Sequence, residues 1–447
     1  MDFKVKSGVG LCGEVSLPGD KSISHRSIMC AALAEGTTTI NGFLAGEDCL
    51  ATLDAFTKMG VDIKRDKNKV VVHGVGLHGL EVPDSELYLG NSGTSMRLMS
   101  GLLAGQNFST VLTGDTSLSV RPMDRVVIPL SLMGANITTS KEGKPPLKIA
   151  PSKELNSLTY ELPIASAQVK SCLMFASLYA KGPVVITESL QTRNHTELMF
   201  RKFGIDVAVR VIGDIREIKV IPPQSFMATD INIPADFSSA AFFILAALIT
   251  PDSNITLRNI GINPTRIALL DVLQEMGAHI SLSNLADEYE PCADITVRAS
   301  KLKGVELDSD LIPNLIDELP VLFIAAALAE GQTNIKGAEE LRTKESDRLE
   351  AMSNLLKGLG VHFKEYDDGI RIQGLNQAFN TSNAGMPFKA TSIDSYGDHR
   401  IAMASAIACT RAEDECYVEN TENILTSFPN FIDICQEVGL NIKENLT

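Results

Sequence analysis

The chain has 447 residues, too many for one ordinary domain, and 44% of them are hydrophobic, which is enough for large buried cores. Its 40 basic and 55 acidic residues give a formal charge of −15, which argues against a general nucleic-acid-binding protein. An anionic ligand would need basic residues that are gathered locally against this overall field.

The apolar runs are short. The longest, AAFFILAALI at residues 240–249, has the length of a buried helix and not of a membrane span. The first residues contain no signal-peptide core, so we expect a cytoplasmic protein. The eight cysteines show no CxxC or metal-ligand spacing, and Cys30, Cys172 and Cys409 fall in apolar helical patterns. We therefore expect buried free thiols.

In chain order, one pattern occurs six times: a polar head, an Ala- and Leu-rich helical run, a small-residue turn and a β-branched strand. The six segments begin DKSISHRS, NSGTSMRL, ASAQVKSC, ADFSSAAF, DELPVLFI and GDHRIAMA, at residues 20, 91, 165, 235, 317 and 397. These helical runs are apolar on nearly all sides, which predicts helices inside a core.

A second, amphipathic helix and a strand pair lie between successive segments. Apolar residues at i, i+3, i+4 and i+7 predict these helices. A glycine then marks the end of each helix, because positive φ costs glycine little. The four glycines are Gly60, Gly134, Gly277 and Gly360. YDDGIRI at 366–372 predicts a hairpin. Each unit is thus approximately helix–strand–helix–strand–strand, with one further strand that closes it, and its amphipathic helix should lie outside.

The polar heads precede helix N-termini, where unpaired N–H groups and the helix dipole attract anions. Ordinary N-capping by Ser or Thr explains any single head. Four heads combine cations with polar groups, and this recurrence favours anion binding. The four sets are Lys21, Ser22 and Arg26; Asn91, Thr94 and Arg97; Ser166, Gln168 and Lys170; and His399 and Arg400.

Three other motifs have competing explanations. GVGLCG at 8–13 matches GxGxxG, but a strand-like segment follows it, so we expect no dinucleotide site. SVRPMDR at 119–125 alone indicates a solvated loop with two arginines. LIDELPVL places Asp317 and Glu318 at a helix start, where the dipole alone favours negative charge.

The segment ELRTKESDRLEAM at 340–352 gathers Lys344, Glu345 and Arg348 within one helical turn. Salt bridges at i,i+4 on an exposed helix would explain the pattern. A Lys–Glu pair beside an arginine is also how a proton donor with a tuned pKa is built. The local pattern does not decide between the two.

Taken together, eight segments in order resemble the enolpyruvyl transferase family, in the branch that acts on shikimate 3-phosphate. They are PGDKSISHR, LGNSGTSMR, RPMDR, ASAQVKS, TRNHTE, KESDRL, GDHRIAMA and TSFPNF. The resemblance implies a two-domain inside-out α/β barrel of six βαβαββ repeats, three per domain. Residues 21–230 would form the first domain and 1–20 with 231–447 the second, with the active site in the cleft between them. ASAQVKS and TRNHTE resemble the glyphosate-tolerant bacterial subclass.

The resemblance implies transfer of the enolpyruvyl group of phosphoenolpyruvate to the 5-hydroxyl of shikimate 3-phosphate, by addition and elimination, without cofactor or metal. We expect a monomer with no nucleic-acid or membrane partner. Shikimate 3-phosphate would be held by Lys21, Ser22, Arg26, Ser166, Ala167, Gln168, Arg193, Asp317 and Lys344. Phosphoenolpyruvate would be held by Lys21, Gly93, Arg121, Gln168, Arg348 and Arg400. Asp317 would draw the hydroxyl proton, and Glu345 would protonate the methylene carbon with help from Lys21 and Lys344.

Three positions depart from the family pattern. Ala167 stands where some members have a second serine, and Thr426 stands where many place a lysine near phosphoenolpyruvate. Gly93 is present where alanine is one source of glyphosate tolerance, which conflicts with the subclass resemblance. Two alternatives remain: the sister enzyme that acts on UDP-N-acetylglucosamine, and a non-catalytic anion-binding protein built on the same repeats.

Overall fold

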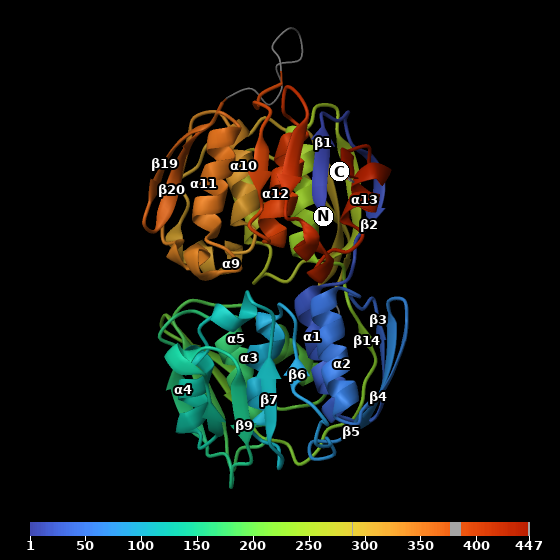
Figure 1. Ribbon diagram of the computed structural model, residues 1–447, viewed down its shortest axis with the longest axis vertical. Helices are drawn as coiled ribbons and strands as arrows, with labels where there is room; N and C mark the ends of the chain where they lie inside the picture. Colours follow the sequence, from blue (N-terminus) through green and yellow to red (C-terminus); the bar gives the residue numbers. More distant parts are fainter. Residues whose placement is uncertain (288, 376–385, 446–447) are drawn as a thin grey trace. The chain divides into compact units, whose positions relative to one another are not determined.

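The computed structural model describes residues 1–287, 289–375 and 386–445. Two compact units are formed: unit 1 comprises Met1–Pro18 and Pro234–Thr447, and unit 2 comprises Gly19–Ile233. The chain therefore passes from one unit to the other after Pro18 and again after Ile233 (Figure 1). The sequence had placed these passages after residues 20 and 230.

Unit 2, all of whose residues are described, contains three four-stranded sheets. Its strands are β3 (Glu35–Asn41), β4 (Asp62–Asp66), β5 (Lys69–Val75), β6 (Leu87–Tyr88), β7 (Thr110–Thr113), β8 (Asn136–Thr138), β9 (Leu147–Ala150), β10 (Leu158–Glu161), β11 (Val184–Glu188), β12 (Val207–Ile212), β13 (Ile215–Val220) and β14 (Ile231–Asn232). The sheet orders are β14-β3-β5-β4, β6-β7-β9-β8 and β10-β11-β13-β12. In each sheet the first two strands are parallel and the later pairs antiparallel, as a βαβαββ repeat requires.

The described residues of unit 1 repeat this arrangement. The strands are β1 (Asp2–Lys6), β2 (Cys12–Ser16), β15 (Asn254–Gly261), β16 (His279–Ala286), β17 (Cys292–Arg298), β18 (Gln332–Ile335), β19 (His362–Tyr366), β20 (Gly369–Gln373), β21 (Ser392–Asp394), β22 (Cys416–Glu419) and β23 (Asn441–Asn445). The orders are β16-β17-β15-β2, β18-β20-β19 and β21-β22-β1-β23. Parallel bridges from Lys303 to Glu330 and from Glu306 to Asn334 replace the first strand of the short sheet.

Each repeat contributes one buried helix and one partly exposed helix. The buried helices are α1 (Lys21–Leu33), α3 (Gly93–Leu103), α5 (Ala167–Ser177), α7 (Phe237–Ile249), α10 (Leu319–Leu328) and α12 (His399–Cys409). The partly exposed helices are α2 (Glu47–Lys58), α4 (Asp124–Leu132), α6 (His195–Lys202), α8 (Ala268–Glu275), α11 (Arg348–Gly358) and α13 (Phe431–Glu437). Short helices are η1 (Leu118–Val120), η2 (Lys141–Gly143), η3 (Ser309–Leu311), α9 (Ile312–Leu315), η4 (Glu339–Thr343) and η5 (Glu422–Thr426). The six predicted repeats are confirmed.

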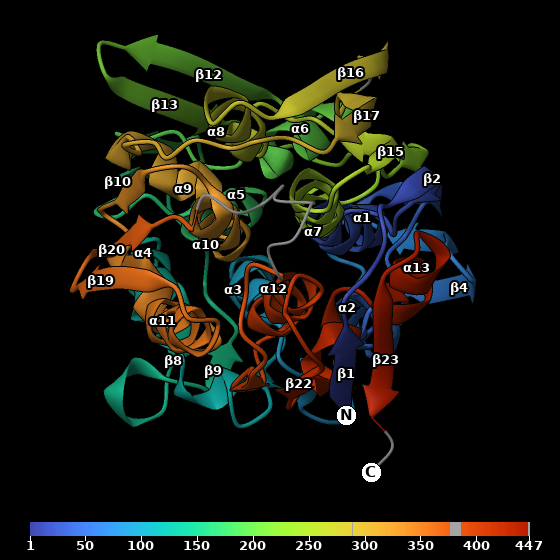
Figure 2. The ribbon, with the colours of Figure 1, turned by 90° about the horizontal axis from the view of Figure 1, so that it is seen from above.

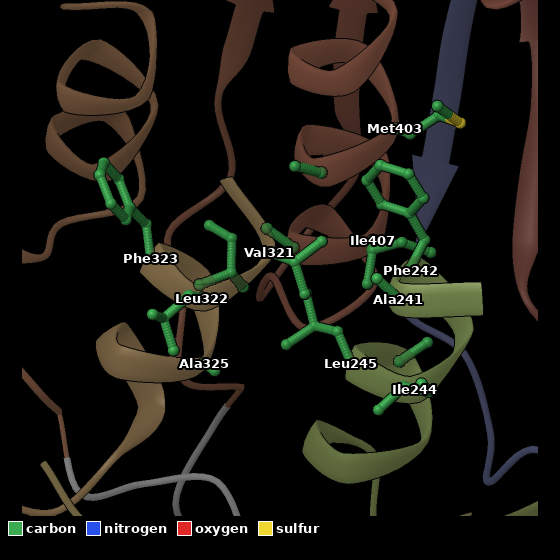
Figure 3. Packing of buried hydrophobic residues seen from close by; sticks show 14 of the residues in the cluster. Ala241, Phe242, Ile244, Leu245, Val321, Leu322, Phe323, Ala325, Met403 and Ile407 are labelled. Carbon is green, nitrogen blue, oxygen red and sulfur yellow. The ribbon is translucent and has the colours of Figure 1, made fainter. Parts of the chain in front are cut away.

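The core of unit 1 lies between α7, α10 and α12, which contact one another. All thirteen residues of α7 are buried, which explains why its sequence is apolar on every side. Leu245 of α7, Val321 of α10 and Ile407 of α12 belong to one packed cluster (Figure 3). In unit 1 these helices lie in the middle and β1, β16 and β19 toward the edge (Figure 2). In unit 2, α3 and α5 pack side by side (Figure 1).

The predicted helix ends are confirmed. Gly60, Gly134, Gly277 and Gly360 have φ of 86°, 92°, 98° and 81°, directly after the amphipathic helices. The hairpin predicted at 366–372 is formed by β19 and β20, which pair antiparallel up to Tyr366 and Gly369.

All eight cysteines are free thiols. Cys30, Cys172 and Cys409 are buried as predicted, whereas Cys12 is exposed and Cys292 is half-buried. Within residues 1–287, 289–375 and 386–445, no single helix is long and apolar enough to cross a membrane. Among the residues that the structure describes, one helix pair, Ser309–Leu315 with Leu319–Leu328, meets that test by length and composition, but it is bent by 118°.

Candidate functional site

The head of α1 is capped by Asp20, and the prediction of a Ser or Thr cap is wrong here. The Asp20 carboxylate accepts a hydrogen bond from the Ile23 backbone N–H at 2.8 Å. This carboxylate satisfies one of the unpaired donors of the first turn. Lys21 follows the cap and forms an ion pair with Asp48, at the start of α2. The cation predicted for both substrates therefore already has a carboxylate partner.

Arg26 lies on the buried side of α1 and is only 3% exposed. Its Nε donates to Thr196 Oγ1 at 2.7 Å, and one terminal nitrogen donates to Ser171 Oγ at 2.8 Å. Its other terminal nitrogen donates to the Ser22 carbonyl at 2.9 Å. Burial lowers the pKa of Arg26 to about 10, against the opposing effect of nearby Glu197, so the guanidinium is still charged at neutral pH. Arg26 thus ties α1 to α5 and α6.

Lys170 of α5 is not an anion-binding cation, and the prediction for this residue is wrong. Its ammonium is fully buried and lies 3.1 Å from Glu188 and 2.8 Å from Glu197. It also donates to the Thr192 carbonyl at 3.4 Å, while Thr192 Oγ1 donates to Glu188 at 2.7 Å. A buried charge with two carboxylate partners is structural. Here it fixes the loop that carries Arg193.

The heads of α3 and α5 meet at Gln168. Its side-chain amide donates to Thr94 Oγ1 at 3.0 Å and its carbonyl accepts from Arg97 at 2.6 Å. Ser166 caps α5 by accepting from the Val169 N–H at 3.4 Å, which agrees with the predicted hydroxyl cap. Ala167 is the first residue of α5. Gln168 is therefore oriented by both helices and not by α5 alone.

Gly93 begins α3 beside two arginines. A Cβ added at Gly93 would lie 3.0 Å from an Arg97 nitrogen and 3.1 Å from an Arg121 nitrogen. Arg121 is 8% exposed and donates to Asn91 Oδ1 at 2.7 Å. These distances are shorter than ordinary van der Waals contact. An alanine here would push on both guanidinium groups.

His25, to which we assign no catalytic role, is buried between α1, α2 and α3. One hydrogen bond joins its Nδ1 to Thr52 Oγ1 at 2.8 Å, and Ser95 Oγ lies 3.3 Å from the same nitrogen. Burial lowers the pKa of His25 well below its usual value of 6.5, and the charges of Lys21 and Arg26 lower it further. The folded chain therefore holds His25 neutral.

This predicts an acid-dependent loss of stability in unit 2. Above pH 6.5 the imidazole is neutral in both states; below it, only the unfolded chain binds the proton. The free energy of unfolding should fall by up to about 1.4 kcal/mol per pH unit from this residue. Urea unfolding at pH 7, 6 and 5 measures it, with His25→Gln as the non-titrating variant. Equal pH slopes for both proteins would contradict the assignment.

In unit 1, Arg348 at the start of α11 is 1% exposed and has three carboxylate partners. Its Nε donates to Asp398 at 2.8 Å, one terminal nitrogen donates to Asp317 at 3.3 Å, and the other donates to Glu345. Burial alone would lower the pKa of Arg348, but the charges of Asp398, Glu345 and Asp317 raise it above its usual value. The guanidinium therefore organises three acids from separate elements.

Arg400, in the first turn of α12, shares Asp317 with Arg348. One Arg400 nitrogen donates to the Asp317 carbonyl at 2.8 Å, and the other lies 3.4 Å from its carboxylate. Glu318 lies 3.6 Å from Arg400. Asp398 caps α12 by accepting from the Arg400 N–H at 2.9 Å. Two arginines and two acids of the predicted set, Asp317 and Glu345, are thus gathered in unit 1.

Comparison with known proteins identifies the family of this chain. The family model for EPSP synthase (3-phosphoshikimate 1-carboxyvinyltransferase) matches residues 5–435. The chain belongs to the EPSP synthase family. Relatives named 3-phosphoshikimate 1-carboxyvinyltransferase include one from Hydrogenovibrio crunogenus, 47% identical over 99% of this chain and 98% of the relative. Another, from Legionella pneumophila strain Corby, is 49% identical over 99% of both chains.

Solved structures agree with this family assignment. An EPSP synthase from Acinetobacter baumannii has a TM-score of 0.87 and 47% identity, covering 99% of both chains. The enolpyruvyl transferase NikO from Streptomyces tendae, at 15% identity, has a TM-score of 0.76 over 99% of this chain and 98% of its own. At that identity, NikO shares the fold alone.

Within this EPSP synthase family member, Lys344 and Glu345 take different partners. Lys344 lies 3.1 Å from Glu340, four residues earlier, but it follows the short helix η4 and precedes α11, so the two residues do not form a salt bridge on an exposed α-helix. Glu345 pairs instead with Arg348, at i,i+3. Thr426 is buried, and its hydroxyl donates to the Asn423 carbonyl at 2.6 Å.

Sequence reasoning missed the partners of the predicted cations: Asp48, Asp398, Ser171 and Thr196. Asp398 had a signal, because an acidic residue just before an apolar helix is an N-cap signature. The other three lie on other elements, distant in sequence, and only the packing of those elements brings them close.

Proposed function

We propose that this chain transfers the enolpyruvyl group of phosphoenolpyruvate to the 5-hydroxyl of shikimate 3-phosphate, in the biosynthesis of aromatic amino acids. The products are 5-enolpyruvylshikimate 3-phosphate and phosphate. Membership of the EPSP synthase family over residues 5–435 supports this. The structural observation that carries the proposal is the pairing of Asp317 and Glu345 with the same guanidinium, Arg348.

The reaction needs acid and base groups because it proceeds by addition and then elimination. The 5-hydroxyl oxygen adds to C2 of phosphoenolpyruvate while a proton is delivered to C3. Phosphate then leaves from C2, and a proton is removed from C3. We assign the hydroxyl proton to Asp317 and the C3 proton, in both directions, to Glu345. A substrate anion that competes for Arg348 would free the Glu345 carboxylate to take up the proton that it exchanges with C3.

Both substrates are polyanions, so several cations are required. Arg348 and Arg400 suit phosphoenolpyruvate because guanidinium groups bind carboxylate and phosphate in a bidentate manner. We assign Lys21, Gly93, Arg121 and Gln168 to the same substrate. To shikimate 3-phosphate we assign Lys21, Ser22, Arg26, Ser166, Ala167, Gln168, Arg193, Asp317 and Lys344. That residues of both units act on one pair of substrates stays a prediction of the sequence.

We further propose membership of the glyphosate-tolerant bacterial subclass, and a cytoplasmic monomer. ASAQVKS and TRNHTE, the motifs that suggest this subclass, interact directly. Lys170 pairs with Glu197 at 2.8 Å, and a hydrogen bond of 2.7 Å joins Ser171 and Thr196. Two motifs that contact each other are expected to change together, which supports their joint use as a subclass marker. Gly93 argues against tolerance, because alanine at this position is one source of it. Inhibition of phosphate release by glyphosate measures the response directly.

One assay tests the proposed reaction. Phosphoenolpyruvate is supplied with shikimate 3-phosphate or with UDP-N-acetylglucosamine, and phosphate release is followed, with each substrate alone as control. We expect release with shikimate 3-phosphate only. Release with the sugar nucleotide only would assign the chain to the sister activity. No release with either acceptor would favour the non-catalytic anion-binding protein.

A further inference from the structure

The head of α7, ADFSSAAF, contains no Lys or Arg, but Arg266 from the loop before α8 contacts it. Asp236 caps this helix by accepting from the Ser238 N–H at 2.7 Å. Arg266 is 3% exposed, donates to Ser238 Oγ at 2.7 Å and lies 3.4 Å from Asp236. A buried guanidinium needs such partners, since burial without them is costly. The position of Arg266 is thus defined by the head of α7.

Ser238 links this arginine to Glu318, at the head of α10. The Ser238 hydroxyl donates to Glu318 Oε1, and an Arg266 nitrogen lies 3.9 Å from the same oxygen. Glu318 is 1% exposed. An Arg400 nitrogen lies 3.6 Å from that same oxygen. One oxygen of the Glu318 carboxylate therefore has two arginines near it, of which only Arg400 belongs to the predicted substrate-binding set.

Asp317 and Glu318, the two acids beside Arg400, have different roles in the proposed reaction. Asp317 is assigned a proton transfer, so its charge and its contacts change during turnover. Glu318 is 1% exposed and has a hydroxyl and two cations as partners, which compensate for the burial of a carboxylate. When a substrate anion displaces Asp317 from Arg400, Glu318 still holds that guanidinium. Arg400 then keeps its direction without reorganisation during the reaction.

We propose that Ser238, Arg266 and Glu318 are positioning residues that hold the Arg400 guanidinium ready for phosphoenolpyruvate. None of the three is assigned to a substrate. The inference rests on the proposed function, in which Arg400 binds this substrate.

Steady-state kinetics of Glu318→Gln and Ser238→Ala test the proposal. A hydrogen bond to a charged group is worth about 1.5–3 kcal/mol, which corresponds to about tenfold or more in binding. Glu318→Gln should raise the KM for phosphoenolpyruvate about tenfold and that for shikimate 3-phosphate less than about twofold. Ser238→Ala should raise the former about threefold to fivefold. The fall in kcat should be smaller than the rise in KM.

Ser300→Ala is the matched control. Ser300 is also buried in unit 1, and its hydroxyl donates to the Arg298 carbonyl at 2.7 Å and accepts from the His279 N–H at 2.8 Å. It belongs to none of the helix heads. Its KM values should stay at the wild-type level even where its thermal midpoint falls.

Each outcome decides. A selective rise in the KM for phosphoenolpyruvate in both test variants supports the positioning role. Unchanged KM values with a lower thermal midpoint, or equal rises for both substrates, would overturn it while the proposed function stands. A wild-type protein that releases no phosphate would instead defeat the proposed function, and this inference with it.

Discussion

Glu345→Gln is expected to lower kcat at least about hundredfold, the usual scale for a general acid or base. Glutamine has nearly the shape of glutamate but cannot deliver a proton to C3 or take one back. Arg348 keeps Asp398 and Asp317 as partners in this variant, so its guanidinium stays in place. Binding of shikimate 3-phosphate, measured by calorimetry, should therefore stay within about twofold of wild type.

Glu350→Gln is the control for this variant. Glu350 lies in the first turn of the same helix, α11, and is exposed. Its loss removes one negative charge near the same helix N-terminus without touching Arg348. We expect wild-type kcat. A wild-type kcat in Glu345→Gln would remove Glu345 from the proton transfer and leave Asp317 and Lys344 as the candidates.

Periodicity is the reason why the repeats could be predicted. A helix that is buried on all sides is apolar at most of its positions, as α7 and α10 are. The ends of the amphipathic helices could likewise be predicted from their glycines, because positive φ is costly for other residues. Both are local properties, so the six-fold recurrence of helix and strand could be read without any knowledge of contacts.

The partners of the cations could not be predicted in this way. Lys170 stands in a polar head with Ser166 and Gln168, as Lys21 stands in one with Ser22, yet Lys170 pairs with Glu188 and Glu197 in the interior. Which side of α5 meets the end of β11 is decided by packing, not by the residues of the head. The predicted cap of α1 was wrong for another reason. Asp20 and Ser22 both suit an N-cap, and the residue at which the helix starts decides between them.

The contacts of Arg266 could not be predicted from its own segment either. Its segment, NPTRIALL at 263–270, begins a partly exposed helix and has no sign of a role. Only the arrangement of the loop before α8 against the head of α7 brings it to Ser238 at 2.7 Å. Support residues of this kind come from elements outside the motif, which is why a family resemblance did not include them.

Arg348→Met is expected to reduce both stability and activity. It leaves Asp398 buried without its cation, and removing one partner of a buried ion pair costs about 3–5 kcal/mol. Asp317 and Glu345 lose the group that gathers them, so kcat/KM should fall at least about a thousandfold. Urea unfolding followed by far-UV circular dichroism measures the first effect, which suits a chain without tryptophan.

Arg400→Met should separate the two effects. Arg400 has a side chain 13% exposed, and its loss leaves Asp317 with Arg348 and Glu318 with Ser238 and Arg266. We expect a stability loss of only about 1 kcal/mol, together with a large rise in the KM for phosphoenolpyruvate. Equal destabilisation by both substitutions would show that Arg348 is not the residue on which the three acids of unit 1 depend. A stability loss confined to Arg348→Met would establish that Arg348 orders the acids and that Arg400 serves chiefly to bind.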